Sequence, residues 1–271
     1  MHEMPQASDE LVSTPALRVY WQPGCSSCLK TKEFLTEHGV PFVSVNVLAD
    51  DNAFRELAEL GLRRVPIVRR GNDWVDGQVI RDVARIAGIR WNAGELLPPA
   101  DLVSRADAVL VAALRLCASI PEDRLDTLYP NRPRSYRQIT AHIAQIFEAY
   151  LDLVERGIRV EHAVYEQDVP LAVTTGEQLV AFVEGVRQCF AHWWSSGGSR
   201  ADFDCRADVY YGEQTLHEFL ERTVWHAGQH TRQLELAVTK LGLRVDPPLT
   251  AADLAGLPLP ENVWDDTLRF D

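Results

Sequence analysis

Two hydrophobic patterns follow one another along the chain. Up to about residue 92, short apolar runs predict strands, and stretches of helical composition lie between them. The expected strands are 17–21, 42–47, 66–68 and 74–75, and the expected helices are 25–38, 54–60 and 79–87. This β-α-β-α-β-β-α order predicts a small sheet with helices packed on its faces.

From about residue 100 onward, the apolar positions recur with a helical period, and no convincing strand pair is expected. Four long helices are expected near 101–118, 134–156, 176–194 and 213–241. Segments that contain Pro and Gly separate these helices, which is typical of an antiparallel four-helix bundle.

The predicted fold class is therefore two domains, an α/β domain followed by an all-α four-helix bundle. A chain of 271 residues is long enough for both. The expected organisation is a leader at 1–16, the α/β domain at 17–92, a linker at 93–103, the helical bundle at 104–245 and an irregular tail at 246–271.

Charge and hydropathy narrow the range of partners and locations. The formal net charge is −12, and such an acidic surface repels nucleic acid and anionic membranes, so neither is an expected partner. Residues 1–16 lack the basic start and apolar run of a signal peptide. The longest apolar stretch, 106–118, is interrupted by Asp107 and Arg115 and is too short to span a bilayer. We therefore expect a cytoplasmic protein.

A C-x-x-C motif, Cys25 and Cys28, lies where the first strand turns into the first helix. Cys25 falls at the helix N-terminus, where the partial positive charge lowers the pKa of a thiol and favours the nucleophilic thiolate. Cys28 lies one turn further and can resolve a mixed disulfide. The alternative is half of a zinc site, but only His38 follows in this domain as a further ligand.

The stretch YWQPGCSSC at 20–28, then Val65-Pro66, then Asp76-Gly77 before a helix resembles the glutaredoxin branch of the thioredoxin fold. The resemblance implies a thioredoxin fold for the α/β domain and catalytic roles for Cys25 and Cys28. It further implies a cis Val65-Pro66 bond, with both residues flanking the groove in which a thiol substrate binds.

Three differences from the glutaredoxin pattern bear on which small thiol the protein binds. Gln22 stands where the family usually has a Lys that binds the glutathione carboxylate, Ser27 replaces an aromatic residue, and Asp76-Gly77 replaces Gly-Gly. Gln22 and Gly77 are thus expected at the groove, and the differences argue against glutathione itself. Residues 23–28 also resemble the arsenate-reductase-like Spx regulators, although Val65-Pro66 and the short domain favour the glutaredoxin branch.

A histidine pair on the last predicted helix has the spacing of metal ligands. His226 and His230 lie one turn apart on one helix face, and Ala227 excludes the H-E-x-x-H protease motif. A third ligand is needed, and the candidates are His142, His162, His192 and His217. His217 precedes His226 by about two and a half turns, so it faces away.

Residues 104–243 resemble DinB-like bundles, which include thiol S-transferases for mycothiol or bacillithiol. Those proteins carry one His on the second helix and H-x-x-x-H on the fourth, so the resemblance implies His142, His226 and His230 as ligands of a divalent ion, zinc or nickel, with open coordination positions. Arg232 stands where the ergothioneine-type sulfoxide synthases have Glu, which excludes that subclass. The alternative is a bundle that keeps these histidines as ordinary polar groups.

Together these features predict a thiol-dependent redox or S-transfer enzyme, with a low-molecular-weight thiol as cosubstrate and a small thiol or disulfide as partner. The dithiol would resolve a mixed disulfide or supply reducing equivalents. One alternative is a glutaredoxin-type disulfide reductase whose helical domain is non-catalytic and serves for homodimer formation. Another is a thiol redox sensor with negligible turnover.

Overall fold

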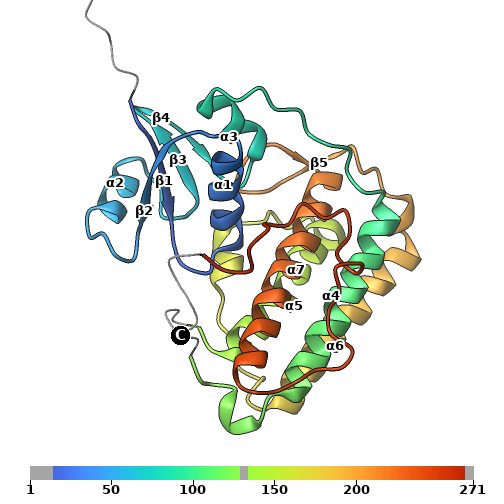
Figure 1. The fold of residues 1–271 in the computed structure, drawn as a ribbon. Helices are drawn as coiled ribbons and strands as arrows, with labels where there is room; N and C mark the ends of the chain where they lie inside the picture. The colour runs from blue at the N-terminus through green and yellow to red at the C-terminus, as the bar shows by residue number, and fades with distance from the viewer. Residues whose placement is uncertain (1–14, 129–133, 266–271) are drawn as a thin grey trace, which may run out of the picture.

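The computed structural model describes residues 15–128 and 134–265. The first part follows the predicted order of strands and helices. Its elements are β1 (Leu17–Trp21), α1 (Ser26–Glu37), β2 (Phe42–Asn46), α2 (Ala53–Glu59), β3 (Ile67–Arg70), β4 (Asp73–Asp76) and α3 (Ile80–Ala87). Figure 1 shows this domain beside the helical one.

The four strands form one sheet in the order β2-β1-β3-β4, with β1 parallel to β2 and antiparallel to β3. One buried cluster, which includes Val19, Leu35 and Val83, joins the sheet to α1 and α3. A second cluster, which includes Tyr20 and Leu57, joins the opposite face to α2. Helices thus cover both faces, and the predicted thioredoxin fold is confirmed.

Four long helices form the second domain, as predicted. They are α4 (Pro99–Ser119), α5 (Tyr136–Arg156), α6 (Gly176–Ser196) and α7 (Leu216–Lys240). Each of the last three begins at a capping box, in which Ser135, Thr175 or Thr215 exchanges hydrogen bonds with the residue three positions later. Helix α4 packs on α6 and α7, and α5 packs on the same two helices.

Two details of the second domain differ from the sequence expectations. Helix α4 begins at Pro99, inside the segment expected to be linker, because proline is well suited to the first turn of a helix. A two-stranded sheet, β5 (Arg206–Ala207) with β6 (Gln214–Thr215), stands where no strand pair was expected. Strands of two residues are too short to produce an alternating pattern.

The tail after α7 contains turns but no helix or strand up to residue 265, and it runs back along the bundle to the α/β domain (Figure 1). Trp264 is buried, and the Asp265 carboxylate lies 2.8 Å from Lys32 Nζ of α1. The Glu33 carboxylate of α1 accepts hydrogen bonds from the backbone amides of Glu261 and Asn262. The tail therefore ties the two domains together. The expected leader lies almost wholly outside the described residues.

Within residues 15–128 and 134–265, every helix is too short or too polar to cross a lipid bilayer.

Candidate functional site

The dithiol occupies the N-terminus of α1. A turn through Gly24, whose positive φ of 68° suits glycine, places Cys25 at the N-cap. Cys25 Sγ accepts a hydrogen bond from the backbone N–H of Cys28 at 3.2 Å, and the two residues form a disulfide with a Cα–Cα distance of 5.2 Å. Cys28 is fully buried and Cys25 is partly exposed. This asymmetry suits an attacking Cys25 and a resolving Cys28.

The groove predicted beside the dithiol is built around a cis Val65-Pro66 bond. The backbone N–H of Gly77 donates to the Pro66 carbonyl at 2.9 Å, and a Cβ at Gly77 would lie 2.9 Å from two atoms of the Pro66 ring. The Thr31 hydroxyl of α1 lies 2.7 Å from the Gly77 carbonyl oxygen. Position 77 therefore requires glycine. Gln22, the other residue expected at the groove, is half-buried and precedes the dithiol on the turn between β1 and α1.

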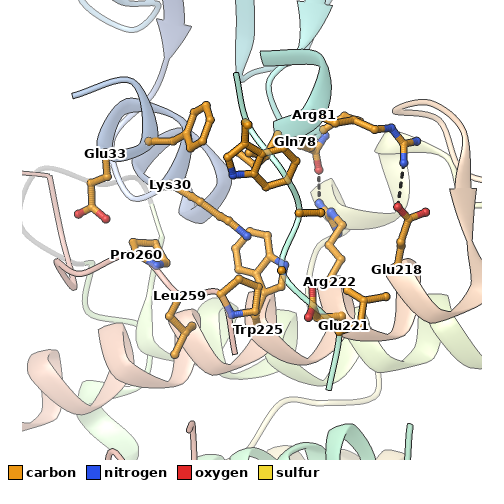
Figure 2. A pocket seen from close by; sticks show the side chains of 18 of the residues that line it. Lys30, Glu33, Gln78, Arg81, Glu218, Glu221, Arg222, Trp225, Leu259 and Pro260 are labelled. Carbon is orange, nitrogen blue, oxygen red and sulfur yellow. Dashed lines mark hydrogen bonds and ion pairs between the residues drawn. The ribbon is translucent and has the colours of Figure 1, made fainter. Parts of the chain in front are cut away.

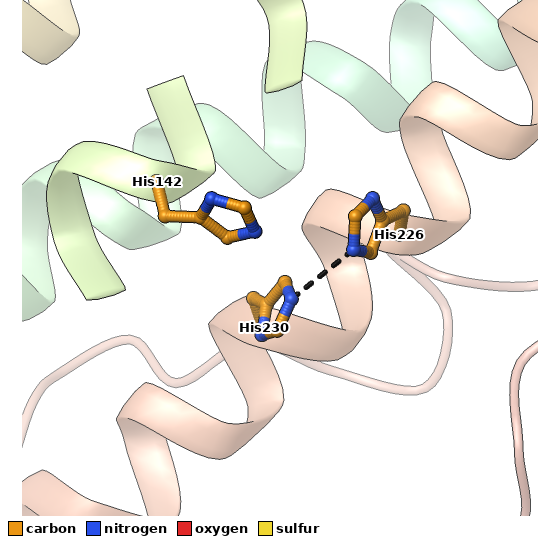
Figure 3. Close-up of side chains that lie close together, drawn as sticks. All are labelled: His142, His226 and His230. Atoms are coloured by element: carbon orange, nitrogen blue, oxygen red, sulfur yellow. Dashed lines mark hydrogen bonds between the residues drawn. The ribbon is translucent and has the colours of Figure 1, made fainter. Parts of the chain in front are cut away.

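Three histidines from two helices meet in the bundle core (Figure 3). His142 comes from α5, and His226 and His230 come from α7; their exposed fractions are 4%, 7% and 2%. One ring nitrogen of each lies within 4.8 Å of the others, and the Nε2 atoms of His226 and His230 are 3.2 Å apart. The structure thus brings together the three histidines that the resemblance to DinB-like bundles implied as ligands.

The other histidine candidates lie elsewhere. His162 lies in a short 3₁₀ helix (His162–Glu166), His192 is exposed, and His217 Nε2 is hydrogen-bonded to the Leu97 carbonyl at 2.8 Å.

The triad fits a divalent metal ion by the chemistry of its donors. His230 Nδ1 lies 2.8 Å from Gln233 Oε1, and the Gln233 amide donates to the Val263 carbonyl at 3.2 Å. Because the Gln233 NH2 group is engaged by a carbonyl, its oxygen faces His230 and accepts the proton of Nδ1. Nε2 then presents its lone pair to the centre of the triad, which is the arrangement that metal-binding histidines adopt. Three neutral imidazoles are donors that suit a divalent metal ion.

The dithiol and the triad lie next to each other. Ser26, which follows Cys25 directly, is 1% exposed, and its Oγ lies 3.3 Å from His230 Nε2. This contact joins residues 204 positions apart, across the packing of α1 against α7. Since Nε2 is the nitrogen that faces the other histidines, the N-terminus of α1 packs directly against the triad.

The sequence analysis missed a charged residue beside the triad. Arg222 lies one turn before His226 on α7 and is 5% exposed. Its guanidinium lies over the rings of Tyr211 and Tyr165, 4.7 and 5.2 Å from their centres, and Nη2 donates to Gln78 Oε1 of the α/β domain. Burial raises the pKa of the Tyr211 hydroxyl well above its ordinary value, so that group stays protonated. The helical spacing from His226 is the signal that could have identified Arg222.

An open cleft of about 470 Å³ separates α1 and the start of α3 from α7 and the tail (Figure 2). Lys30 and Trp225 face each other across it, with Nζ 4.3 Å from the centre of the indole ring. Burial lowers the pKa of Lys30 to about 8, although the negative charge of Glu221 acts in the other direction and raises that pKa. Gln78 and Arg222 also line this cleft, so it leads from the surface to the contact between the domains.

Comparisons with known proteins follow the same division of the chain. The family model for glutaredoxin matches residues 17–80, and that for the DinB superfamily matches residues 105–234. An uncharacterized glutaredoxin-like 8.6 kDa protein in a rubredoxin operon of Clostridium pasteurianum is 34% identical over 65 residues, 24% of this chain and 80% of that protein. The global transcriptional regulator Spx of Bacillus subtilis (strain 168) is 24% identical over 131 residues, 44% of this chain and 91% of Spx.

Proposed function

Since this chain belongs to the glutaredoxin family through its first domain and carries a DinB-superfamily domain after it, we propose that it is a thiol-dependent metalloenzyme. In this proposal His142, His226 and His230 hold a divalent ion, and Cys25 and Cys28 serve the reaction that takes place there. The contact between Ser26 Oγ and His230 Nε2, at 3.3 Å, carries the proposal. Ser26 directly follows Cys25 in the chain, so this contact supports a dithiol that works next to the triad.

The ion would bind the sulfur of a small thiol as a thiolate or polarise a carbonyl of the other substrate. The chain's own residues prepare this site. Gln233 holds the proton of His230 on Nδ1, so Nε2 is a ligand without losing a proton first. The Ser26 hydroxyl lies beside the triad, where it can donate a hydrogen bond to a bound thiol.

The dithiol reduces a disulfide that contains the small thiol. The Cys25 thiolate attacks one sulfur, a mixed disulfide forms, and the other half leaves as a thiolate that takes up a proton. The Cys28 thiolate then attacks Cys25 Sγ, which releases the second thiol and forms the Cys25–Cys28 disulfide. Two electrons pass from the dithiol to the substrate, and two equivalents of a second, more reducing low-molecular-weight thiol restore the dithiol and leave as their own disulfide.

The burial of the residues around Cys25 favours small substrates. Pro23, Gly24 and Ser26 are all buried, and Cys25 alone of the residues from 23 to 28 is partly exposed. An extended protein segment needs open surface on both sides of the reactive sulfur, whereas a small disulfide needs only a narrow entrance. A small-molecule thiol or disulfide is therefore the proposed partner.

The test compares metal content and thiol-dependent turnover in Cys25→Ser and His230→Ala, with Cys189→Ser and His192→Ala as controls, because both control residues are exposed. We expect about one equivalent of metal in the wild type and in Cys25→Ser, and its loss in His230→Ala. Turnover of small disulfides or electrophiles should be lost in both test variants and kept in both controls. Full turnover in His230→Ala, or wild-type protein that takes up no divalent metal, would refute the proposal.

A second candidate function is a thiol redox sensor, and the similarity to a transcriptional regulator over 131 residues favours it. The Cys25–Cys28 state would then change the α1–α7 contact rather than drive turnover. This candidate predicts negligible turnover and a shift in oligomeric state between the oxidised and reduced protein, measured by analytical ultracentrifugation.

A further inference from the structure

We propose that Arg222 binds a carboxylate of the small thiol, so that the cosubstrate is an anionic thiol acid rather than a neutral thiol. This inference rests on the proposed function and specifies the chemical class of the thiol.

Arg222 is a buried charge without a counter-ion. It forms no ion pair with any carboxylate among the described residues, and its Nε and Nη1 atoms are buried without a hydrogen bond of ordinary geometry, although the Tyr165 hydroxyl lies close enough to interact with the guanidinium. Asp76, which contributes to the electrostatic field at Arg222, is already paired with Arg64 at 2.8 Å. A buried guanidinium is costly unless an anion accompanies it, and a bound carboxylate would supply that anion.

The groups around Arg222 suit a carboxylate. The Tyr211 hydroxyl is buried, stays protonated and has no hydrogen-bond partner among the described residues, so it offers a second donor beside the guanidinium. Nε and Nη1 point to different edges of the guanidinium, and each offers an N–H to an oxygen of a bound carboxylate. The remaining Nη2 is held by Gln78, which fixes the plane of the group (Figure 2).

Arg222 is connected to the surroundings of both reactive centres. Gln78, its hydrogen-bond partner, directly follows Gly77, which packs on Pro66 at the predicted groove. On α7, Arg222 precedes His226 by one turn, and side chains at this spacing start about 5–6 Å apart. A short thiol acid held by Arg222 could therefore present its sulfur to the triad or to the dithiol.

The acidic residues of the cleft do not neutralise Arg222. Glu218 is paired with Arg81 at 2.8 Å, and Glu33 accepts hydrogen bonds from the backbone of the tail. The negative charge of Glu221 stabilises the positive charge of Lys30 and raises the pKa of that amine. Lys30 and Arg222 are thus the cations of the cleft for which no ion pair is formed among the described residues, and of the two only Arg222 is buried.

The experiment uses the reduced full-length protein loaded with zinc and two probes of equal length, 3-mercaptopropionate and the neutral 3-mercaptopropanamide. Binding of each is measured by isothermal titration calorimetry. We expect the acid to bind the wild type roughly tenfold or more tightly than the amide. Arg222→Gln should abolish this preference, Arg222→Lys should keep part of it, and Tyr211→Phe should weaken it.

The control is Arg81→Gln, which removes a cation of the same cleft that is already paired with Glu218 and should keep the preference. Circular dichroism of each variant establishes that it is folded, and Tyr211→Phe keeps the ring under Arg222. Equal binding of acid and amide by the wild type, or a preference that survives in folded Arg222→Gln, would overturn the proposal and leave Arg222 with a purely structural role over Tyr165 and Tyr211.

Binding and turnover separate this inference from the proposed function. A preference for the acid that depends on Arg222, in a protein without thiol-dependent turnover, would support the carboxylate site and reject the enzyme. Turnover that is equal with acid and amide would reject the carboxylate site and support the enzyme.

Discussion

Single side chains set the chemistry of the triad, and Gln233 shows this most clearly. Its amide joins the Nδ1 atom of His230 to the carbonyl of Val263 in the tail. One hydrogen-bonded amide therefore decides which nitrogen of His230 carries the proton. The sequence could not predict this role, because the partner carbonyl lies 30 residues away in a segment without regular structure.

Gln233→Leu should lower the metal affinity of the protein about 10- to 100-fold, as the loss of a hydrogen bond to a metal-binding histidine typically does. Competition with a chelating dye measures the affinity. Gln229→Leu is the matched control, because the Gln229 side chain also donates to the tail, at the Asn262 and Val263 carbonyls, whereas its hydrogen bonds among the described residues do not include His230. Equal affinity in Gln233→Leu and Gln229→Leu would contradict the role assigned to Gln233.

At the scale of elements, α7 carries most of the site on one face. Arg222, His226, His230 and Gln233 follow one another at spacings of four, four and three residues. The helix and its histidine pair were predictable, because a helical period and an i, i+4 pair are local signals. The spacing from His226 could have placed Arg222 on the same helix face, but its burial was not predictable, because a charge in a sequence says nothing about burial or a counter-ion.

Thr215→Ala should destabilise the protein by about 1 kcal/mol, because it removes the capping box at the start of α7. Urea denaturation measures the free energy of unfolding. Thr239→Ala serves as the control, since Thr239 is exposed near the end of the same helix and its hydroxyl donates a hydrogen bond to the Glu235 carbonyl of that helix. An equal loss of stability in both variants would show that the cap has no particular effect.

At the scale of the whole molecule, the decisive feature is how the two domains meet. Their individual folds followed from local patterns, the C-x-x-C turn in one and the helical period in the other. The contact between them joins residues more than 130 positions apart, such as Gln78 with Tyr210 and Ser26 with His230. No local pattern encodes such a contact, and only the structure places the dithiol beside the triad.

The most direct test of this arrangement is nuclear magnetic resonance of the protein loaded with Co²⁺, whose unpaired electrons shift and broaden nearby signals. If the ion is held by the triad beside the dithiol, the amide signals of Cys25 and Ser26 should be strongly affected, together with those around His230. The amide of Gly61, which lies after α2 on the opposite face of the sheet from α1, should change much less. Co²⁺ effects around His230 that leave Cys25 and Ser26 unchanged, or no Co²⁺ effect at the triad, would contradict the account.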